Sequence, residues 1–312
     1  MAVQADLSWI NCNSKNNYKI EKRENTVMKN ALLSSLLLWS VVAFGQTAKV
    51  LIVGDSWAQQ QYSDGIHDAV FDVNGYPDIS ILDNADAAAV AIDGTTAEDW
   101  VDPVELQKIT DALVNNPSVD TVQLTLGGND FLNNWHTDMT LMETDALKAG
   151  IVADLQVIVD AILAVDSQIE IIMSFYDYPN FEETTSGFFG ETCATLHNGM
   201  LNPTPSEINN MALEFTDAFV EISNQNIKVF HVPHWGRMQN AYGSSDGSFG
   251  PGDIPLPGYT ELTSPLVAMR THFGFVKDCF HLEPAGYDIL VQALFEDYFL
   301  YRFDTVYKSH FE

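Results

Sequence analysis

Short apolar runs recur along the chain, and each is the length of a single strand. They are rich in valine, isoleucine and leucine, and most of them lack the polar alternation of a half-exposed strand. Continuous runs of this kind are typical of strands buried on both faces of a parallel sheet. The predicted strands are Lys49–Val53, Asp78–Leu82, Thr121–Leu126, Ile169–Phe175 and Ile227–Val232, of which the second is the weakest.

Amphipathic patterns at helical spacing follow these runs. Pro103 stands in the first turn of one pattern, and Thr204 with Glu207 forms a capping-box arrangement at the start of another. The predicted helices are Pro103–Asn115, Thr144–Val165, Thr204–Asn224 and Glu283–Tyr301. Strands that alternate with helices predict an α/β protein with helices on both faces of the sheet. We find no internal repeat and no interdomain linker.

One long segment has no clear period. Trp235–His272 is rich in Gly, Ser and Pro, and it is too long for an ordinary connection. We expect a functional loop or lid there.

The N-terminal region is predicted to lie outside the fold. Lys29 follows Met28, an uncharged apolar run covers Ala31–Phe44, and the pattern Val42-Ala43-Phe44-Gly45 resembles a cleavage site. This is typical of a secretory signal peptide over Met28–Gly45. A transmembrane anchor or a buried helix is the alternative, but the run is short for a membrane span. We therefore expect residues 1–45 to be removed, leaving one domain over 46–312 in a secreted or periplasmic protein.

The charge balance excludes some classes of partner. The 312-residue chain has 14 Lys and Arg against 43 Asp and Glu, a net charge of −29. No basic stripe exists to neutralise phosphates, so nucleic acid is not an expected partner. Anionic membrane surfaces are disfavoured for the same reason, and no stable membrane insertion is expected after the signal peptide is cleaved. The sequence leaves the oligomeric state open.

Cysteine usage agrees with export. Cys12 falls in the leader, which leaves Cys193 and Cys279 as an even pair. In an oxidising compartment such a pair favours a disulfide, and two separate buried thiols are the alternative.

Polar residues gather where the predicted strands end. Gly54-Asp55-Ser56-Trp57 follows the first strand, Gly127-Gly128-Asn129-Asp130 follows the third, and Asp93-Gly94-Thr95-Thr96 lies between them. Asp278-Cys279-Phe280-His281 precedes the last helix. Ligands of open α/β sheets bind at the carboxyl ends of strands, so these segments predict a site at that edge.

Taken in order, these four blocks resemble the SGNH hydrolases, also called GDSL-type lipases and esterases. The resemblance spans Lys49 to about Tyr301, and GGND together with DCFHLEPAGY makes it specific. It implies a three-layer α/β/α sandwich with a parallel, flavodoxin-like five-stranded sheet. Trp57 stands where leucine is usual after the nucleophile, which changes the wall beside Ser56 but not its chemistry.

The resemblance also implies the roles of the site residues. Ser56 would be the nucleophile, His281 its general base and Asp278 the group that orients the imidazole. The amides of Ser56 and Gly94 and the side chain of Asn129 would form the oxyanion hole. No metal or organic cofactor is expected. A weaker expectation is that Trp57 and Trp135 line the substrate pocket.

The remaining histidines are expected to be structural or solvated. His231 and His234 have a spacing that could suit a metal, but no third ligand is evident. Gly243-Ser244-Ser245-Asp246-Gly247 has the letters of a nucleophile elbow, but no strand precedes it, so we assign it to a loop. The histidines concerned are His67, His136, His197, His231, His234 and His272.

The function predicted from these observations is a secreted serine esterase or lipase that cleaves carboxylic esters through an acyl-enzyme on Ser56. Its substrate would be a small-molecule or polymeric ester. One alternative is an O-acetylesterase that acts on polysaccharide with the same triad. A non-catalytic binding module on a flavodoxin-like sheet is the alternative from another class.

Overall fold

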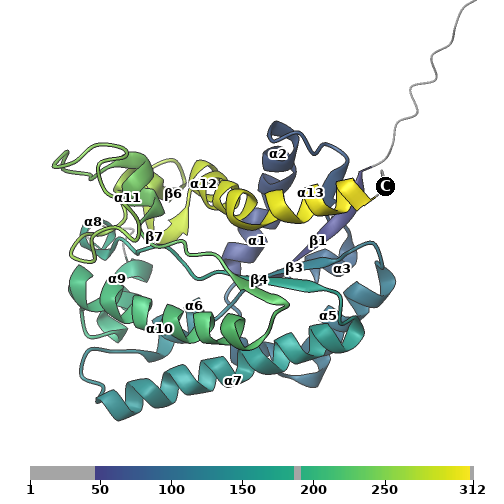
Figure 1. Ribbon diagram of the computed structural model, residues 1–312. Coiled ribbons are helices and arrows are strands. Elements are labelled where there is room, and N and C mark those ends of the chain that lie inside the picture. Colours follow the sequence, from purple (N-terminus) through teal and green to yellow (C-terminus); the bar gives the residue numbers. More distant parts are fainter. Residues whose placement is uncertain (1–45, 186–190, 310–312) are drawn as a thin grey trace, which may run out of the picture. The chain divides into compact units, whose positions relative to one another are not determined.

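The computed structural model describes residues 46–185 and 191–309 (Figure 1). The predicted signal peptide, Met28–Gly45, lies outside the described residues. Among the residues described, no helix combines the length and the apolar character that a bilayer crossing requires.

Five parallel strands form the central sheet, in the order β2-β1-β3-β4-β5. Each lies within or largely overlaps one of the predicted runs, and this order is the flavodoxin-like one. The strands are β1 (Thr47–Gly54), β2 (Ile79–Ile81), β3 (Thr121–Thr125), β4 (Glu170–Met173) and β5 (Val229–His231).

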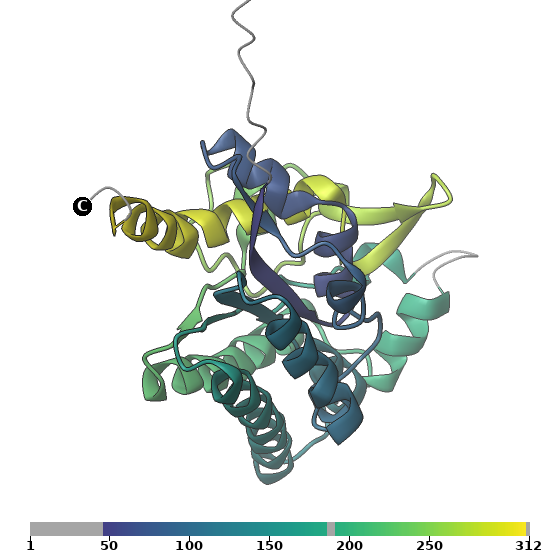
Figure 2. The same cartoon turned by 90° about the vertical axis from the view of Figure 1, so that its right-hand side faces the viewer.

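Helices cover both faces of this sheet (Figures 1 and 2). One layer contains α1 (Ser56–Ser63), α2 (Ile66–Val73), α12 (Pro284–Leu294) and α13 (Leu300–Ser309). The opposite layer contains α5 (Pro103–Asn115), α7 (Leu141–Val165) and α10 (Pro205–Gln225). The predicted three-layer α/β/α architecture is therefore confirmed.

The long helices begin and end close to the predicted residues. Helix α5 has the predicted bounds, and Thr204 with Glu207 forms the expected capping box of α10. Helix α7 begins earlier than predicted because Thr140 caps it together with Glu143. A π-helical turn, η2 (Phe295–Phe299), separates α12 from α13 in the region predicted as one helix.

Several shorter helices connect the strands. They are α3 (Ala85–Ala88), α4 (Ala97–Trp100), α6 (Gly128–Asn134), α8 (Phe181–Thr184), α9 (Glu191–Gly199) and α11 (Arg237–Tyr242).

The segment predicted as one long loop, Trp235–His272, is partly regular. It contains α11, a 3₁₀ turn η1 (Leu266–Ala268) and strand β6 (Met269–His272). Strand β6 pairs in antiparallel fashion with β7 (Val276–Leu282), so residues 278–281, predicted in a loop, lie in a strand. The sequence of β7 mixes charged, polar and apolar residues without a period, which explains why its pattern does not indicate a strand.

The middle of the sheet is buried on both faces, and it includes polar side chains. Gln123 in β3 is fully buried; it accepts from Nε2 of His67 at 2.6 Å and donates to Gln61 at 2.9 Å. Because each buried polar group needs a partner, His67 on α2 and Gln61 on α1 pair with β3 inside the core. This packing holds α1, which begins at Ser56, against the sheet.

Candidate active site

The serine of the first block stands at a sharp turn from β1 into α1. Gly54 ends β1 with φ +150°, and a Cβ there would lie 2.0 Å from the carbonyl oxygen of Thr125 on β3. Only glycine allows the two strands to approach this closely. The chain then turns at Asp55, and Ser56 becomes the first residue of α1, 3 % exposed.

Asp55 caps the helix that Ser56 begins. Its Oδ1 accepts from the backbone amide of Trp57 at 3.0 Å, and its Oδ2 accepts from the hydroxyl of Tyr176 at 2.6 Å. Burial raises the pKa of the Asp55 carboxyl to about 7, although both hydrogen bonds act in the opposite direction. The carboxyl that positions the start of α1 is therefore expensive to ionise.

The last block lies where the β6–β7 ladder is interrupted. Met269 pairs with Leu282 and Thr271 with Lys277, so the four residues from Asp278 to His281 lie opposite the single residue Arg270. Such a bulge changes the direction in which the side chains near a strand end point. Oδ1 of Asp278 accepts from the amides of Phe280 and His281, each at 2.9 Å, which stabilises the bulge from within.

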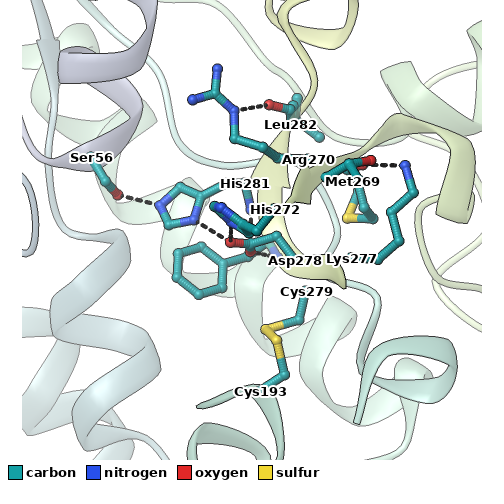
Figure 3. Close-up of polar contacts among 12 residues, drawn as sticks. Ser56, Cys193, Met269, Arg270, His272, Lys277, Asp278, Cys279, His281 and Leu282 are labelled. Carbon is teal, nitrogen blue, oxygen red and sulfur yellow. Dashed lines mark hydrogen bonds and ion pairs between the residues drawn. A yellow bond between two sulfur atoms is a disulfide. The ribbon is translucent and has the colours of Figure 1, made fainter. Parts of the chain in front are cut away.

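Serine, histidine and aspartate meet in one line of hydrogen bonds (Figure 3). Oγ of Ser56 lies 2.7 Å from Nε2 of His281, and Nδ1 of His281 lies 2.9 Å from Oδ2 of Asp278. The serine and the histidine are 225 positions apart in sequence. As the sequence predicts, folding brings the hydroxyl and the imidazole within proton-transfer distance.

The charge state of Asp278 suits this arrangement. Burial alone would raise the pKa of the carboxyl, but the hydrogen bond and charge of His281 and two backbone amides outweigh it. Together they hold the pKa of Asp278 well below its usual range. The group facing Nδ1 of His281 is thus a carboxylate near neutral pH, and a carboxylate holds the proton on Nδ1 and leaves Nε2 free to accept.

Gly94 and Asn129 belong to two segments that are joined to each other by hydrogen bonds. Nδ2 of Asn129, on α6, donates to the carbonyl of Thr95 at 2.9 Å. Oδ2 of Asp130 accepts from the amide of Ala97 at 2.8 Å. The Gly94 loop is also tied to the end of β1, because the amide of Ile92 donates to the carbonyl of Gly54 at 2.9 Å. An amide group has two hydrogens, so Asn129 keeps a second one to donate.

The two tryptophans do not provide the predicted pocket walls. Trp57 is fully buried, stacked on Tyr176 with ring centroids 4.6 Å apart and in edge contact with Tyr287. Trp135 is 5 % exposed and stacks on Phe131. The expectation is wrong because position along the chain beside a site does not reveal that the rings of Trp57, in α1, and Trp135, just after α6, pack into the core. The ring of Trp57 stacks on Tyr176, which bonds Asp55, and so supports the site from behind.

A disulfide joins Cys193 on α9 to Cys279 on β7, with Cα atoms 5.8 Å apart (Figure 3). The sequence left this pairing open. Cys279 lies directly between Asp278 and the remaining residues of the bulge, and its carbonyl accepts from the amide of Asn180 at 2.7 Å. By distance, the two sulfurs and Asp278 form a group that could hold a metal, but the sulfurs are bonded to each other and are not free thiolates.

One further histidine contacts the site, contrary to the expectation that it is merely structural or solvated. Nε2 of His272 lies 3.0 Å from Oδ2 of Asp278 (Figure 3). Tyr176 is a second residue that the sequence did not identify. The four sequence blocks carry no signal for either residue, because the contact of His272 depends on the bulge and that of Tyr176 on the turn after β1.

The sequence also matches a known protein family. The sequence model of the GDSL-like lipase/acylhydrolases matches residues 50–294. No curated protein matches the chain.

Similar solved structures include three esterases or lipases. The first is a GDSL-like lipase from Bacteroides thetaiotaomicron, with 14% identity, a TM-score of 0.43 and coverage of 80% of this chain and 87% of that one. A carbohydrate acetylesterase family member from Sinorhizobium meliloti has 12% identity, a TM-score of 0.45 and coverage of 79% and 95%. A family 3 carbohydrate esterase from Clostridium thermocellum has 15% identity, a TM-score of 0.41 and coverage of 80% and 94%.

Proposed function

The chain belongs to the GDSL-like lipase/acylhydrolase family, and on this premise we propose that Ser56, His281 and Asp278 are the catalytic triad with which it hydrolyses carboxylic esters. The observation that carries the proposal is the 2.7 Å contact between Oγ of Ser56 and Nε2 of His281. A serine hydroxyl is a weak nucleophile near neutral pH, and a base at this distance removes its proton as it attacks.

The reaction would proceed in two halves. Oγ of Ser56 attacks the ester carbonyl while its proton moves to Nε2 of His281, and the carbonyl oxygen becomes an oxyanion. His281 then gives the proton to the departing alcohol, which leaves an acyl-enzyme. A water molecule, deprotonated by His281, releases the acid in the second half. Asp278 stabilises the imidazolium that forms in each half.

The oxyanion would be held by three amide donors. The backbone amide of Ser56 lies at the N-terminal end of α1, where the helix dipole favours negative charge. The loop of Gly94, with φ +76°, is fixed to the end of β1, and Asn129 is fixed to that loop through Thr95. Donors that are held before the reaction begins need no reorganisation in the transition state.

Export is part of the proposal. The predicted signal peptide supports it, and so does the disulfide between Cys193 and Cys279, since disulfides persist mainly in oxidising compartments. Sequencing the N-terminus of the protein recovered from the medium or periplasm tests this. A mature chain that begins near Gln46 is expected, and a protein retained in the cytoplasm with its leader intact would contradict it.

Two measurements test the enzymatic proposal. A fluorophosphonate probe is expected to label wild-type protein on Ser56, as read by peptide mass spectrometry, and to leave S56A unlabelled. S56A is also expected to keep its fold and to lose several orders of magnitude in ester hydrolysis, as loss of a triad nucleophile does elsewhere. S63A is the matched control, because Ser63 ends the same helix and is exposed. Turnover by S56A at the rate of S63A would reject the assignment.

The acyl group would be identified with p-nitrophenyl esters from acetate to palmitate. A preference for medium chains is expected of a general esterase. A sharp preference for acetate, with release of acetate from acetylated polysaccharide, would replace this assignment with a carbohydrate O-acetylesterase.

A further inference from the structure

We infer that His272 is a positioning residue for the proposed triad, which it reaches by sharing the carboxylate of Asp278 with His281. The inference rests on the proposed function. It concerns a side chain on β6, outside the four blocks that make up the predicted site.

With His272 included, each oxygen of the Asp278 carboxylate accepts two hydrogen bonds. Oδ1 accepts from the amides of Phe280 and His281, each at 2.9 Å. Oδ2 accepts from Nδ1 of His281 at 2.9 Å and from Nε2 of His272 at 3.0 Å. A carboxylate has about four acceptor positions, so two donors on each oxygen fix it against rotation about its terminal torsion. Without His272, the oxygen that faces His281 would be held by His281 alone.

The hairpin places His272 diagonally across from Asp278. His272 pairs with Val276, and side chains two residues apart on a strand share a face, which makes Asp278 the diagonal neighbour of His272. Three residues, Phe273 to Phe275, connect the two strands, and Phe273 has φ +53° and Gly274 has φ +81°. Two positive φ values are those of a type I′ turn, the tight turn that suits twisted hairpins. Phenylalanine rarely adopts this conformation, and the side chain of Phe273 is exposed.

The other charged side chains of the hairpin have partners elsewhere. Arg270 pairs with Asp64 and also donates to the carbonyl of Leu282 at 3.1 Å. Lys277 donates to the carbonyl of Met269 at 2.7 Å and pairs with Glu283 at 3.3 Å. His272 is therefore the hairpin side chain that bonds Asp278 besides His281, and 46% of its side chain is accessible against 12% for Asp278.

The arrangement fixes the proton positions along the line. Both imidazoles donate an N–H to Oδ2 of Asp278, which leaves Nε2 of His281 unprotonated and able to accept from Ser56. Loss of the His272 donor would let the carboxylate rotate. The imidazole of His281 would then be held less firmly in the orientation in which Nε2 faces Ser56. Such a change affects the chemical step and leaves the binding of substrate alone.

The test compares two variants of His272 on the full exported chain, with p-nitrophenyl acetate as substrate. H272L removes the donor, whereas H272Q keeps an N–H at the same number of bonds from Cα. We expect H272L to lose roughly tenfold in kcat, the loss typical of one hydrogen bond to a charged group, with KM nearly unchanged. We expect H272Q to recover most of kcat. H136Q is the matched control, since His136 is similarly exposed and pairs with Asp138. H272A serves as a second donor-free variant if H272L does not fold.

A spectroscopic measurement decides the question without turnover. The Nδ1 proton of His281, bonded to Asp278, is expected as a downfield proton resonance that is absent in D278A. It should shift or broaden in H272L and return in H272Q. An unchanged resonance and an unchanged kcat in H272L would overturn the inference, as would equal losses in H272L and H272Q. If wild-type protein neither hydrolyses esters nor labels at Ser56, the proposed function fails, while the resonance still tests the contact of His272 with Asp278.

Discussion

Tyr176 donates a 2.6 Å hydrogen bond to the carboxyl of Asp55, the residue immediately before Ser56. Both side chains are buried, and Trp57 stacks on the ring of Tyr176. The phenol thus lies beneath the first turn of α1 and supports the cap that fixes where Ser56 stands.

Removing this hydroxyl is expected to destabilise the protein in a pH-dependent way. The pKa of Asp55 is raised to about 7 by burial, and the Tyr176 hydrogen bond favours the ionised form. In Y176F the carboxyl is therefore harder to ionise. Near pH 5 Asp55 is protonated with or without the phenol, so the loss is that of a neutral hydrogen bond, about 1 kcal/mol. Near pH 9 the loss should grow to about 2–3 kcal/mol of unfolding free energy.

Urea unfolding of Y176F and Y178F at both pH values checks this. The hydroxyl of Tyr178 donates to the backbone carbonyl of Pro257 at 2.9 Å, a partner that does not titrate. Y178F should therefore lose the same amount of unfolding free energy at pH 5 and at pH 9. A loss in Y176F that is equally independent of pH would show that Asp55 is not the group involved.

Because His67 on α2 is buried, we expect the folded protein to lose stability in acid. Burial lowers the pKa of His67 to about 4, with the Gln123 hydrogen bond acting against this. An unfolded histidine binds its proton near pH 6.5, so between that pH and about 4 the unfolded state holds the extra proton and stability falls with falling pH. The complete loss amounts to about 3 kcal/mol.

H67Q isolates this contribution, because glutamine offers Gln123 an N–H and does not titrate. We expect H67Q to be less stable than wild type at pH 7 and the gap to shrink as pH falls to 4. The other titrating groups are the same in both proteins, so their contributions cancel in the difference between the two unfolding free energies. A gap that stays constant over this range would contradict the expectation.

Asn129 is expected to act on the transition state. If its remaining amide hydrogen stabilises the oxyanion, N129A should lose about 10²–10³-fold in kcat. N134A is the control on the same helix: Asn134 is exposed and its side chain donates to the carbonyl of Asp130 at 2.8 Å. Steady-state kinetics on one ester are sufficient. Equal rates for the two variants would remove Asn129 from the proposed oxyanion hole.

The disulfide is expected to stabilise both the fold and the site. It closes a loop of 86 residues, for which the chain-entropy account gives about 4.6 kcal/mol. C193S/C279S should therefore melt at a clearly lower temperature and should also lose kcat, because Cys279 lies inside the bulge that presents His281. The double variant avoids leaving one buried free thiol. A melting temperature and a kcat that both match the wild type would show that the bridge is dispensable.

Much of the sheet was predictable because its central strands are buried on both faces, and most of their residues are apolar. The run at Lys49–Val53 and the helix Pro103–Asn115 are examples in which one local pattern decides the structure. Helices α1 and α2 were not predicted, because they place Gln61 and His67 in the core, where polar residues hide the apolar face. Their burial depends on a partner in β3 that lies far away in sequence.

The proximity of Ser56 and His281 was predictable from ordered motifs, whereas the contact of His272 with Asp278 was not. The latter depends on a bulge that places four residues opposite Arg270 and on a turn with positive φ at Phe273. Neither feature has a signature in the residues themselves. Trp57 shows the converse: its place next to Ser56 in sequence suggests a pocket, but the helix turns the ring away.

The 225 positions that separate Ser56 from His281 also set when activity can begin. A ribosome completes the nucleophile and the whole parallel sheet before it synthesises the imidazole that must face them. Until the final hairpin emerges, the nascent chain holds a hydroxyl without its base and is inert toward any ester nearby. A chain that stops ahead of β7 would lack both Asp278 and His281, so the proposed triad can form only after β7 has been synthesised.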